Sequence, residues 1–190
     1  MSRTLRRVRR LRCMSSHDDP TETMTERAGV EATFLHFDDV KPQRVRAQRH
    51  PDGSERSVWD RWFVISRDPP FVTLHTTWDP DVIVHRHGHL GHHLMYVLRG
   101  GMWCGDRWCT VGTYIDLPEG AAAGPYVAGP DGVDLFEVTM GDGRSWASDH
   151  DEFARLLTER GVTPLPNPPI DLPDWLEDRR NDQTQLTSPD

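Results

Sequence analysis

The stretch VIVHRHGHLGHHLMYVLRGG, residues 82–101, contains five of the chain's ten histidines within nine positions. Its first three residues are apolar and β-branched, which favours a strand. Side chains two positions apart on a strand leave the same face, so His85 and His87 are expected to project together. A second strand is predicted over residues 92–100, after the turn GHLG. The stretch therefore predicts two neighbouring strands that both carry imidazoles.

The chain around this stretch consists of short apolar segments separated by Pro, Gly and Asp. These segments are rich in aromatic and β-branched residues, which favours strands. Gly105 and Asp106 are expected to form a two-residue hairpin turn that places Trp103 opposite Trp108. A series of such strands with regular turns predicts an all-β sandwich or barrel. The predicted strands cover residues 59–67, 71–78, 81–87, 92–100, 102–111, 113–118, 124–129 and 134–140.

A helix is expected only late in the chain, over residues 148–161. Ser148 or Asp149 is the expected N-cap, Phe153 and Leu157 share an apolar face, and Gly161 ends the helix. The proline-rich segment 163–173 is expected to run extended over the surface. We therefore divide the chain into a disordered N-terminal extension (1–30), a β-domain (31–146), and a C-terminal helix with an extended tail (147–190).

Composition narrows the classes of partner. The formal charge of −8 argues against nucleic acid as a partner, because nucleic-acid binding depends on clustered Lys and Arg. The chain has no run of 18 apolar residues that would span a membrane, and the arginines near its start lack the apolar region of a signal peptide. Three cysteines do not make a disulfide framework. We therefore expect a cytoplasmic protein that acts on a small molecule.

The histidines predict a metal site. Two imidazoles on the inner face of a strand supply half of the ligands that a mononuclear site needs. The third ligand is expected from the next strand, where alternation lets either His92 or His93 point inward, and both alternatives stay open. His89 lies in the turn and is expected to be solvated.

The same stretch resembles the first motif of the cupin family, which has H-x-H, a few residues, a glutamate ligand, six residues and a glycine. His85 and His87 match the two histidines, and Gly100 matches the closing glycine. The glutamate position, seven residues before Gly100, falls on His93.

A second cupin motif resembles residues 112–126, GTYIDLPEGAAAGPY. Gly112, Pro118 and Gly120 stand at the family spacing, and the family's histidine ligand falls on Ala123. The two motifs together imply a cupin-like jelly-roll β-barrel whose usual ligand set is altered.

The resemblance implies a mononuclear metal site and a dioxygenase acting on a small oxygenated organic substrate. Fe(II) is the first expectation for the metal, followed by Zn, Ni and Mn. Glu119 and Tyr126 are the candidate catalytic residues, Glu119 as a carboxylate base. The residues Arg86, Arg99, Tyr114 and Tyr126 are candidates for orienting a polar substrate.

Two other functions and one assembly state stand beside this hypothesis. The alternative function is a non-catalytic cupin that binds a small molecule or senses metal. A third hypothesis, a metal-free isomerase or epimerase, would need a histidine with an acid partner, and the sequence shows no such partner. His75 is a remote candidate for a further ligand. Apolar residues on the outer face, together with several tryptophans, predict a homodimer.

Overall fold

The computed structural model describes residues 31–173. The predicted extension 1–30 and residues 174–190 of the predicted tail lie outside this range. Its elements are η1 (Phe37–Asp39), β1 (Gln43–Arg49), β2 (Glu55–Arg67), β3 (Pro70–Trp78), β4 (Ile83–Val84), β5 (His87–His89), β6 (His92–Cys104), β7 (Arg107–Thr110), β8 (Tyr114–Leu117), β9 (Ala122–Ala123), β10 (Tyr126–Met140), β11 (Ser145–Ala147), α1 (His150–Arg160) and β12 (Thr163–Pro164). None of the helices in residues 31–173 is long and apolar enough to cross a membrane.

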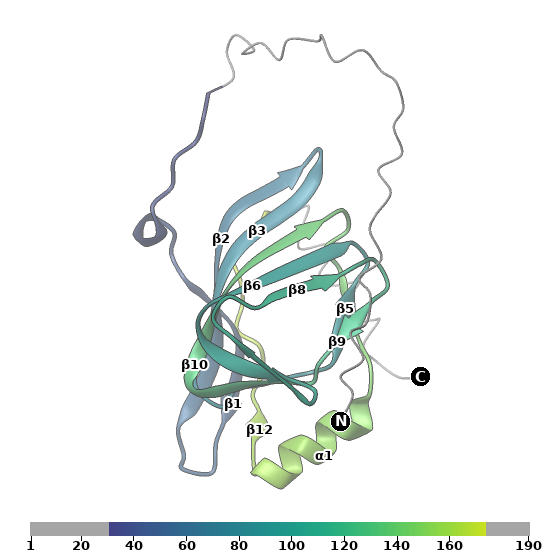
Figure 1. The fold of residues 1–190 in the computed structure, drawn as a ribbon. Coiled ribbons are helices and arrows are strands. Elements are labelled where there is room, and N and C mark those ends of the chain that lie inside the picture. The colour runs from purple at the N-terminus through teal and green to yellow at the C-terminus, as the bar shows by residue number, and fades with distance from the viewer. Residues whose placement is uncertain (1–30, 174–190) are drawn as a thin grey trace, which may run out of the picture. The chain divides into compact units, whose positions relative to one another are not determined.

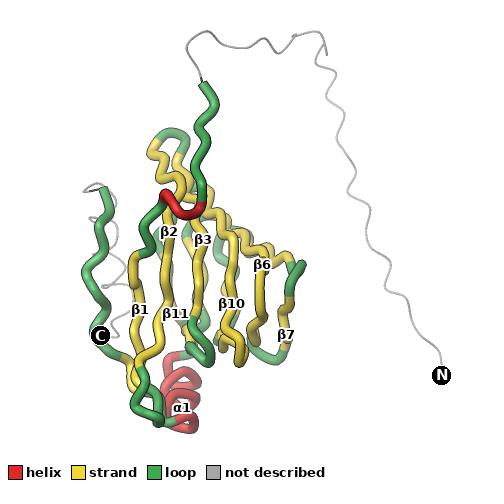
Figure 2. The backbone as a smooth tube through the Cα atoms, turned by 90° about the vertical axis from the view of Figure 1, so that its left-hand side faces the viewer, coloured by secondary structure: helices red, strands yellow, loops and turns green. Residues whose placement is uncertain are grey.

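The strands form two antiparallel sheets. The larger sheet has the order β12-β1-β2-β3-β10-β6-β7, with β4 paired to β10 and β8 paired to β6. The smaller sheet has the order β11-β5-β9. Figure 1 shows the larger sheet curving so that β5 and β9 lie across from β10 and β1, and Figure 2 shows its central strands side by side. The predicted all-β jelly-roll architecture with one short C-terminal helix is confirmed.

The core fills the space between the sheets. Alternate residues of β6 and β10, among them Met95, Val97, Val133 and Leu135, are buried because they face this space. The indole of Trp78 meets the Tyr126 ring edge-on, with ring centroids 5.9 Å apart. The apolar alternation of the sequence therefore sets the inner face of the larger sheet.

Helix α1 covers one end of the sheets. Its buried Leu157 packs with Ile83 of β4 and Val127 of β10. The helix follows Asp149, its N-cap, and ends at Gly161, whose φ of 62° suits glycine because it lacks a Cβ. The predicted helix and its C-terminal stop are confirmed.

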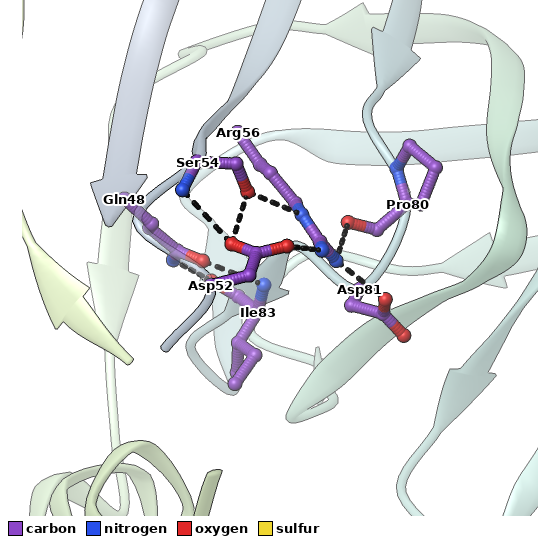
Figure 3. Close-up of polar contacts among 7 residues, drawn as sticks. All are labelled: Gln48, Asp52, Ser54, Arg56, Pro80, Asp81 and Ile83. Carbon is purple, nitrogen blue, oxygen red and sulfur yellow. Dashed lines mark hydrogen bonds and ion pairs between the residues drawn. The ribbon is translucent and has the colours of Figure 1, made fainter. Parts of the chain in front are cut away.

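A polar network holds β4 in place beside β1 and β2 (Figure 3). The side-chain amide of Gln48 accepts from the backbone N–H of Ile83 at 3.0 Å and donates to the carbonyl oxygen of the same residue. Arg56 donates to the carboxylates of Asp52 and Asp81. These contacts fix where the chain leaves β4 and enters the histidine-rich segment.

The predicted hairpin is confirmed, because Trp103 pairs with Trp108 and their ring centroids lie 5.3 Å apart. Several strands differ from the expectation. Strand β1 was not predicted, since its arginines obscure the alternation. Residues 81–87 form β4 and the start of β5 with a break between them, and residues 126–140 form one strand, β10, whose register shifts between Ala128 and Val133.

Candidate functional site

Three imidazoles and one carboxylate come together on the inner side of the sheets. His87 and His89 share a face of β5, and their ring centroids are 5.5 Å apart. The ring of His93, from β6, lies 4.3 Å from that of His89. Glu137 of β10 lies beside His93, with Oε2 2.8 Å from Nε2. We call these four residues, His87, His89, His93 and Glu137, the histidine cluster.

Backbone carbonyls orient two of the rings. Nδ1 of His87 lies 2.9 Å from the carbonyl oxygen of His85, and Nδ1 of His89 lies 3.0 Å from that of Gly143. Because a carbonyl oxygen only accepts, each Nδ1 carries the proton and donates it. Nε2 of both rings then keeps its lone pair, which is how metal-binding histidines are commonly held.

Burial keeps these two rings neutral. It lowers the pKa of His87 to about 3, helped by the neighbouring His89. It lowers the pKa of His89 to about 4, helped by His93. At neutral pH both imidazoles are uncharged, the form in which histidine binds metal.

His93 and Glu137 form a buried pair. Their side chains are 2% and 13% exposed. His93 donates from Nε2 to the carboxylate, and its Nδ1 is buried without a hydrogen-bond partner. A buried nitrogen without a partner is uncommon and marks a group that is available to a ligand.

The cluster opens onto a cavity of about 300 Å³. Its wall is mainly apolar and comes from β1, β2 and β3, while the proline-rich segment after β12 contributes Asn167, Ile170 and Leu172. This size lies at the lower end of small-molecule sites. The residues facing it include Val45, Arg46, Val58, Asp60, Trp62, Val72, Leu74, Thr76, Trp78, Val84, His87, His89, Glu137 and Thr139.

Two charged residues face the cavity from the strands opposite the cluster. Burial raises the pKa of Asp60 to about 7; a hydrogen bond from Thr76 acts against this, the charge of Glu137 adds to it, and that of Arg46 opposes it. Burial lowers the pKa of Arg46, and Asp60 raises it again. The cavity therefore holds a guanidinium beside a carboxyl group that is partly protonated at neutral pH.

The placement expected for His85 is corrected. Its ring stacks on Phe153 of α1, with centroids 3.4 Å apart and planes inclined by 28°, and lies 5.7 Å from the ring of His150. The expectation assumed one continuous strand over residues 81–87. Because β4 ends at Val84 and β5 begins at His87, the alternation breaks and His85 turns to the outside.

Strand β6 separates the two adjacent histidines. His93 points inward, whereas His92 projects outward and pairs with Asp116. Of the two alternatives left open by the sequence, the inward residue is His93.

The other candidate residues lie away from the cavity or take another role. Glu119 is exposed between β8 and β9, and it does not line the cavity. Tyr126 is fully buried, and burial raises its pKa, so it stays protonated and packs 5.5 Å from the His87 ring instead of acting as a base.

The expected orienting residues bind protein groups elsewhere. Arg86 pairs with Asp149 at 3.2 Å, Arg99 pairs with Asp134, and Tyr114 is exposed. His75 packs on the ring of Phe37, with centroids 4.8 Å apart, because β3 pairs with β2 and β10 and not with β4.

His89 and Glu137 were missed as site residues. His89 could have been found by shifting the motif: His87, one residue, His89, three residues, His93, six residues and Gly100 fits the first cupin motif better than the pair His85 and His87. Glu137 occupies an inward position of the alternating segment DLFEVTM, where an acidic residue is out of place in an apolar pattern.

The donor set of the histidine cluster suits a divalent metal, with neutral imidazoles, free Nε2 atoms, a buried unpartnered Nδ1 and one carboxylate. Two imidazoles that share an ion at a metal–nitrogen distance of about 2 Å have ring centres roughly 4.5–5 Å apart, close to the spacings within the cluster. In residues 31–173, however, no group of three His, Cys, Asp or Glu side chains is arranged to hold an ion as it stands. Metal binding therefore requires the rings to turn.

Comparison with known proteins gives likeness of structure only. No family model and no curated protein matches the chain. A proposed acetylacetone dioxygenase from Methylibium petroleiphilum PM1 is similar with a TM-score of 0.51 and 11% identity, over 67% of this chain and 88% of that one. An RmlC-like cupin protein from Ralstonia eutropha JMP134 has a TM-score of 0.48 and 15% identity, over 72% and 93% of the two chains.

A third solved structure, the polyketide cyclase RemF from Streptomyces resistomycificus, has a TM-score of 0.44 and 22% identity, over 83% of this chain and 100% of that one. At such identities the likeness concerns the fold and not the reaction. Strand order and the first of these comparisons agree on the fold, and the chain has a jelly-roll fold like that of the cupin proteins.

Proposed function

We propose that the protein is a metal-dependent cupin enzyme, specifically a dioxygenase with Fe(II) that acts on a small oxygenated organic substrate. The observation that supports it is the histidine cluster, in which neutral imidazoles and a carboxylate face one small, mostly apolar cavity. Zn, Ni and Mn are the other candidate metals.

His87 and His89 would bind the ion through Nε2, and His93 would complete a set of three imidazoles. Such a set would leave the full charge of the ion to attract an anionic or chelating substrate, and Fe(II) held there would supply the binding of dioxygen and substrate. The carbonyls of His85 and Gly143 keep the two Nδ1 protons in place.

The remaining residues of the site shape the reaction space. The apolar wall excludes water, which strengthens electrostatic interactions inside the cavity. Within the cluster Glu137 accepts from His93, and its carboxylate would accept a proton from a substrate bound there.

Metal analysis of the untagged protein tests the site. We expect about one divalent ion per chain in the wild type, and loss of most of it in His87→Ala, His89→Ala and His93→Ala. His85→Ala and His92→Ala are matched controls, because each is adjacent in sequence but points away from the cluster. Equal metal loss in the controls, or full retention in the cluster variants, contradicts the proposed site.

A second candidate, a binding module without turnover, is favoured by one observation. Ala123, at the position of the usual fourth ligand, packs against the apolar core. Oxygen uptake by Fe(II)-loaded protein with small diketones and oxygenated acids separates the two functions. Metal content that depends on the cluster, without oxygen uptake on any compound, supports the binding module.

A further inference from the structure

Arg46 is a buried cation that the protein leaves without a direct partner. Within residues 31–173 its guanidinium makes no hydrogen bond and no ion pair, whereas Arg56 on the next strand reaches two carboxylates. The side chain of Arg46 is only partly accessible to solvent, and it lines the cavity. A buried charge without a partner is costly, so its retention points to a ligand.

The carboxyl group beside Arg46 does not neutralise it. No nitrogen of Arg46 lies within ion-pair distance of Asp60, although the two charges attract each other across the cavity. Burial and Glu137 both hold Asp60 partly protonated. Arg46 therefore faces the cavity without a paired carboxylate.

The cation and the histidine cluster face the same cavity. Arg46 and His87 both line the cavity wall. Apolar side chains of Val45, Val58 and Val84 complete this wall. A ligand that fits is short, apolar in the middle, anionic at one end and able to offer oxygen atoms to the cluster.

We propose that Arg46 binds the carboxylate of a small organic monoacid whose second oxygen function reaches the histidine cluster. The planar guanidinium binds a carboxylate through two parallel N–H···O bonds, which fixes both the position and the direction of the ligand. This proposal rests on the proposed function, since it names the substrate class of the same site.

The probes are small monocarboxylates with an oxo group at the far end of a short apolar chain, among them 4-oxopentanoate and 5-oxohexanoate, each compared with its uncharged amide. We expect calorimetry on the metal-loaded wild type to show that at least one acid binds about tenfold or more tightly than its amide. Arg46→Met should abolish that preference by weakening the acid alone. Arg49→Met is the matched control, because Arg49 lies on the same strand but pairs with Glu55 at the surface, and it should bind as the wild type does.

Stability distinguishes a ligand-binding role from a structural one. Removal of an unpaired buried charge should leave the melting temperature of Arg46→Met unchanged or higher, whereas loss of a structural arginine would lower it. If the variant fails to fold, the acid-to-amide comparison on the wild type still decides. Equal affinity for acid and amide, or no binding of any acid, overturns the proposal.

The metal content of the same preparations separates this proposal from the proposed function. Metal-loaded protein without a preference for acids overturns the role of Arg46 alone. A preference for acids that depends on Arg46 in protein that binds no metal overturns the metal enzyme and leaves the anion site standing.

Discussion

At the scale of single residues, His85 and His87 show how the two-residue gap between strands β4 and β5 decides which histidine enters the histidine cluster. His87 lies in the cluster, while His85 stacks on Phe153 outside it. Burial lowers the pKa of His85 to about 4, so its ring is neutral in the folded protein at neutral pH. His85 therefore serves the packing of α1.

The first prediction concerns the pH dependence of stability. Unfolded His85 binds a proton near its ordinary pKa of about 6.5, whereas the folded residue does not until about pH 4. The unfolded state thus binds more protons between these values, and stability is lost as pH falls through this range. In His85→Phe we expect the loss between pH 7.5 and pH 5 to be smaller than in the wild type by about 1 kcal/mol, after allowance for partial exposure.

Urea unfolding at the two pH values measures this difference. Identical pH dependence in the wild type and His85→Phe would show that His85 titrates alike in the folded and unfolded states, contrary to its buried position against α1.

How far the sequence predicts the site depends on the backbone at each residue. His87 and Gly100 follow from motif spacing, which also puts the motif's glutamate position on His93, whereas strand alternation alone leaves His92 and His93 open. His85 and His89 do not follow in this way, because the choice between them depends on where β4 ends, and β-branched residues on both faces leave that boundary undetermined. The inward position of Arg46 is not predictable either, because polar and charged residues in an alternating strand are ordinarily expected on its solvent-exposed face.

At the scale of elements, two glutamines of β1 act alike. Gln48 bonds both backbone groups of Ile83 in β4, and Gln43 bonds both backbone groups of Asp171 in the proline-rich segment, at 2.9 Å and 2.6 Å. Gln48 is buried, whereas the contact of Gln43 is at the surface. The two glutamines therefore allow a comparison between a buried contact that holds β4 and a surface contact that holds the proline-rich segment.

Gln48→Leu should lower the free energy of unfolding by about 2–4 kcal/mol, because two buried backbone groups lose their partner. Gln43→Leu should cost less than about 1 kcal/mol but speed hydrogen exchange in residues 165–173, of which Asn167, Ile170 and Leu172 line the cavity. Urea unfolding and exchange followed by mass spectrometry check both. Equal destabilisation by the two substitutions would contradict the distinction.

Gly100 marks the point where β6 and β10 lose register. Its φ is 66°, and a Cβ there would lie 2.1 Å from the carbonyl oxygen of Gly132. Gly100→Ala should therefore destabilise the protein by more than about 3 kcal/mol, from backbone strain and from the clash. Gly53→Ala is the control, with a φ of 82° but open space around the Cβ, and should cost about 1 kcal/mol.

Thermal unfolding of the two variants tests the assignment. If Gly53→Ala and Gly100→Ala lose the same stability, positive φ alone matters and the close approach of the strands does not.

The architecture as a whole is predictable from sequence because turn residues repeat between apolar segments. The long β10 is not, since its register shift occurs inside a Gly-Pro-Asp-Gly stretch that is typical of a loop.

At the scale of the whole molecule, the outer face of the larger sheet carries an aromatic row. Tyr96 pairs in register with Phe136 on one side and with Tyr114 on the other. Their side chains are 42%, 38% and 58% exposed, and Leu98 is exposed on the same strand. Cross-strand rings of this kind form a continuous apolar surface that favours association.

We expect the protein to be a homodimer through this face. Light scattering after size exclusion should give about twice 21.8 kDa at micromolar concentration. Tyr96→Glu should give the monomer mass, while Val64→Glu, an exposed apolar position on β2, should not change it. A monomeric wild type would contradict the prediction.

Strand β9 sets Ala123 directly opposite His87 of β5, so the two side chains leave the same face of the smaller sheet as neighbours. The number of ligands at the site is therefore adjustable at a position that now presents only a methyl group. Ala123→His would place a fourth imidazole beside that of His87 without any change of backbone. In the proposed metal site this imidazole would take a coordination position from substrate or dioxygen, so the methyl group of Ala123 would decide how many reactants the site can hold.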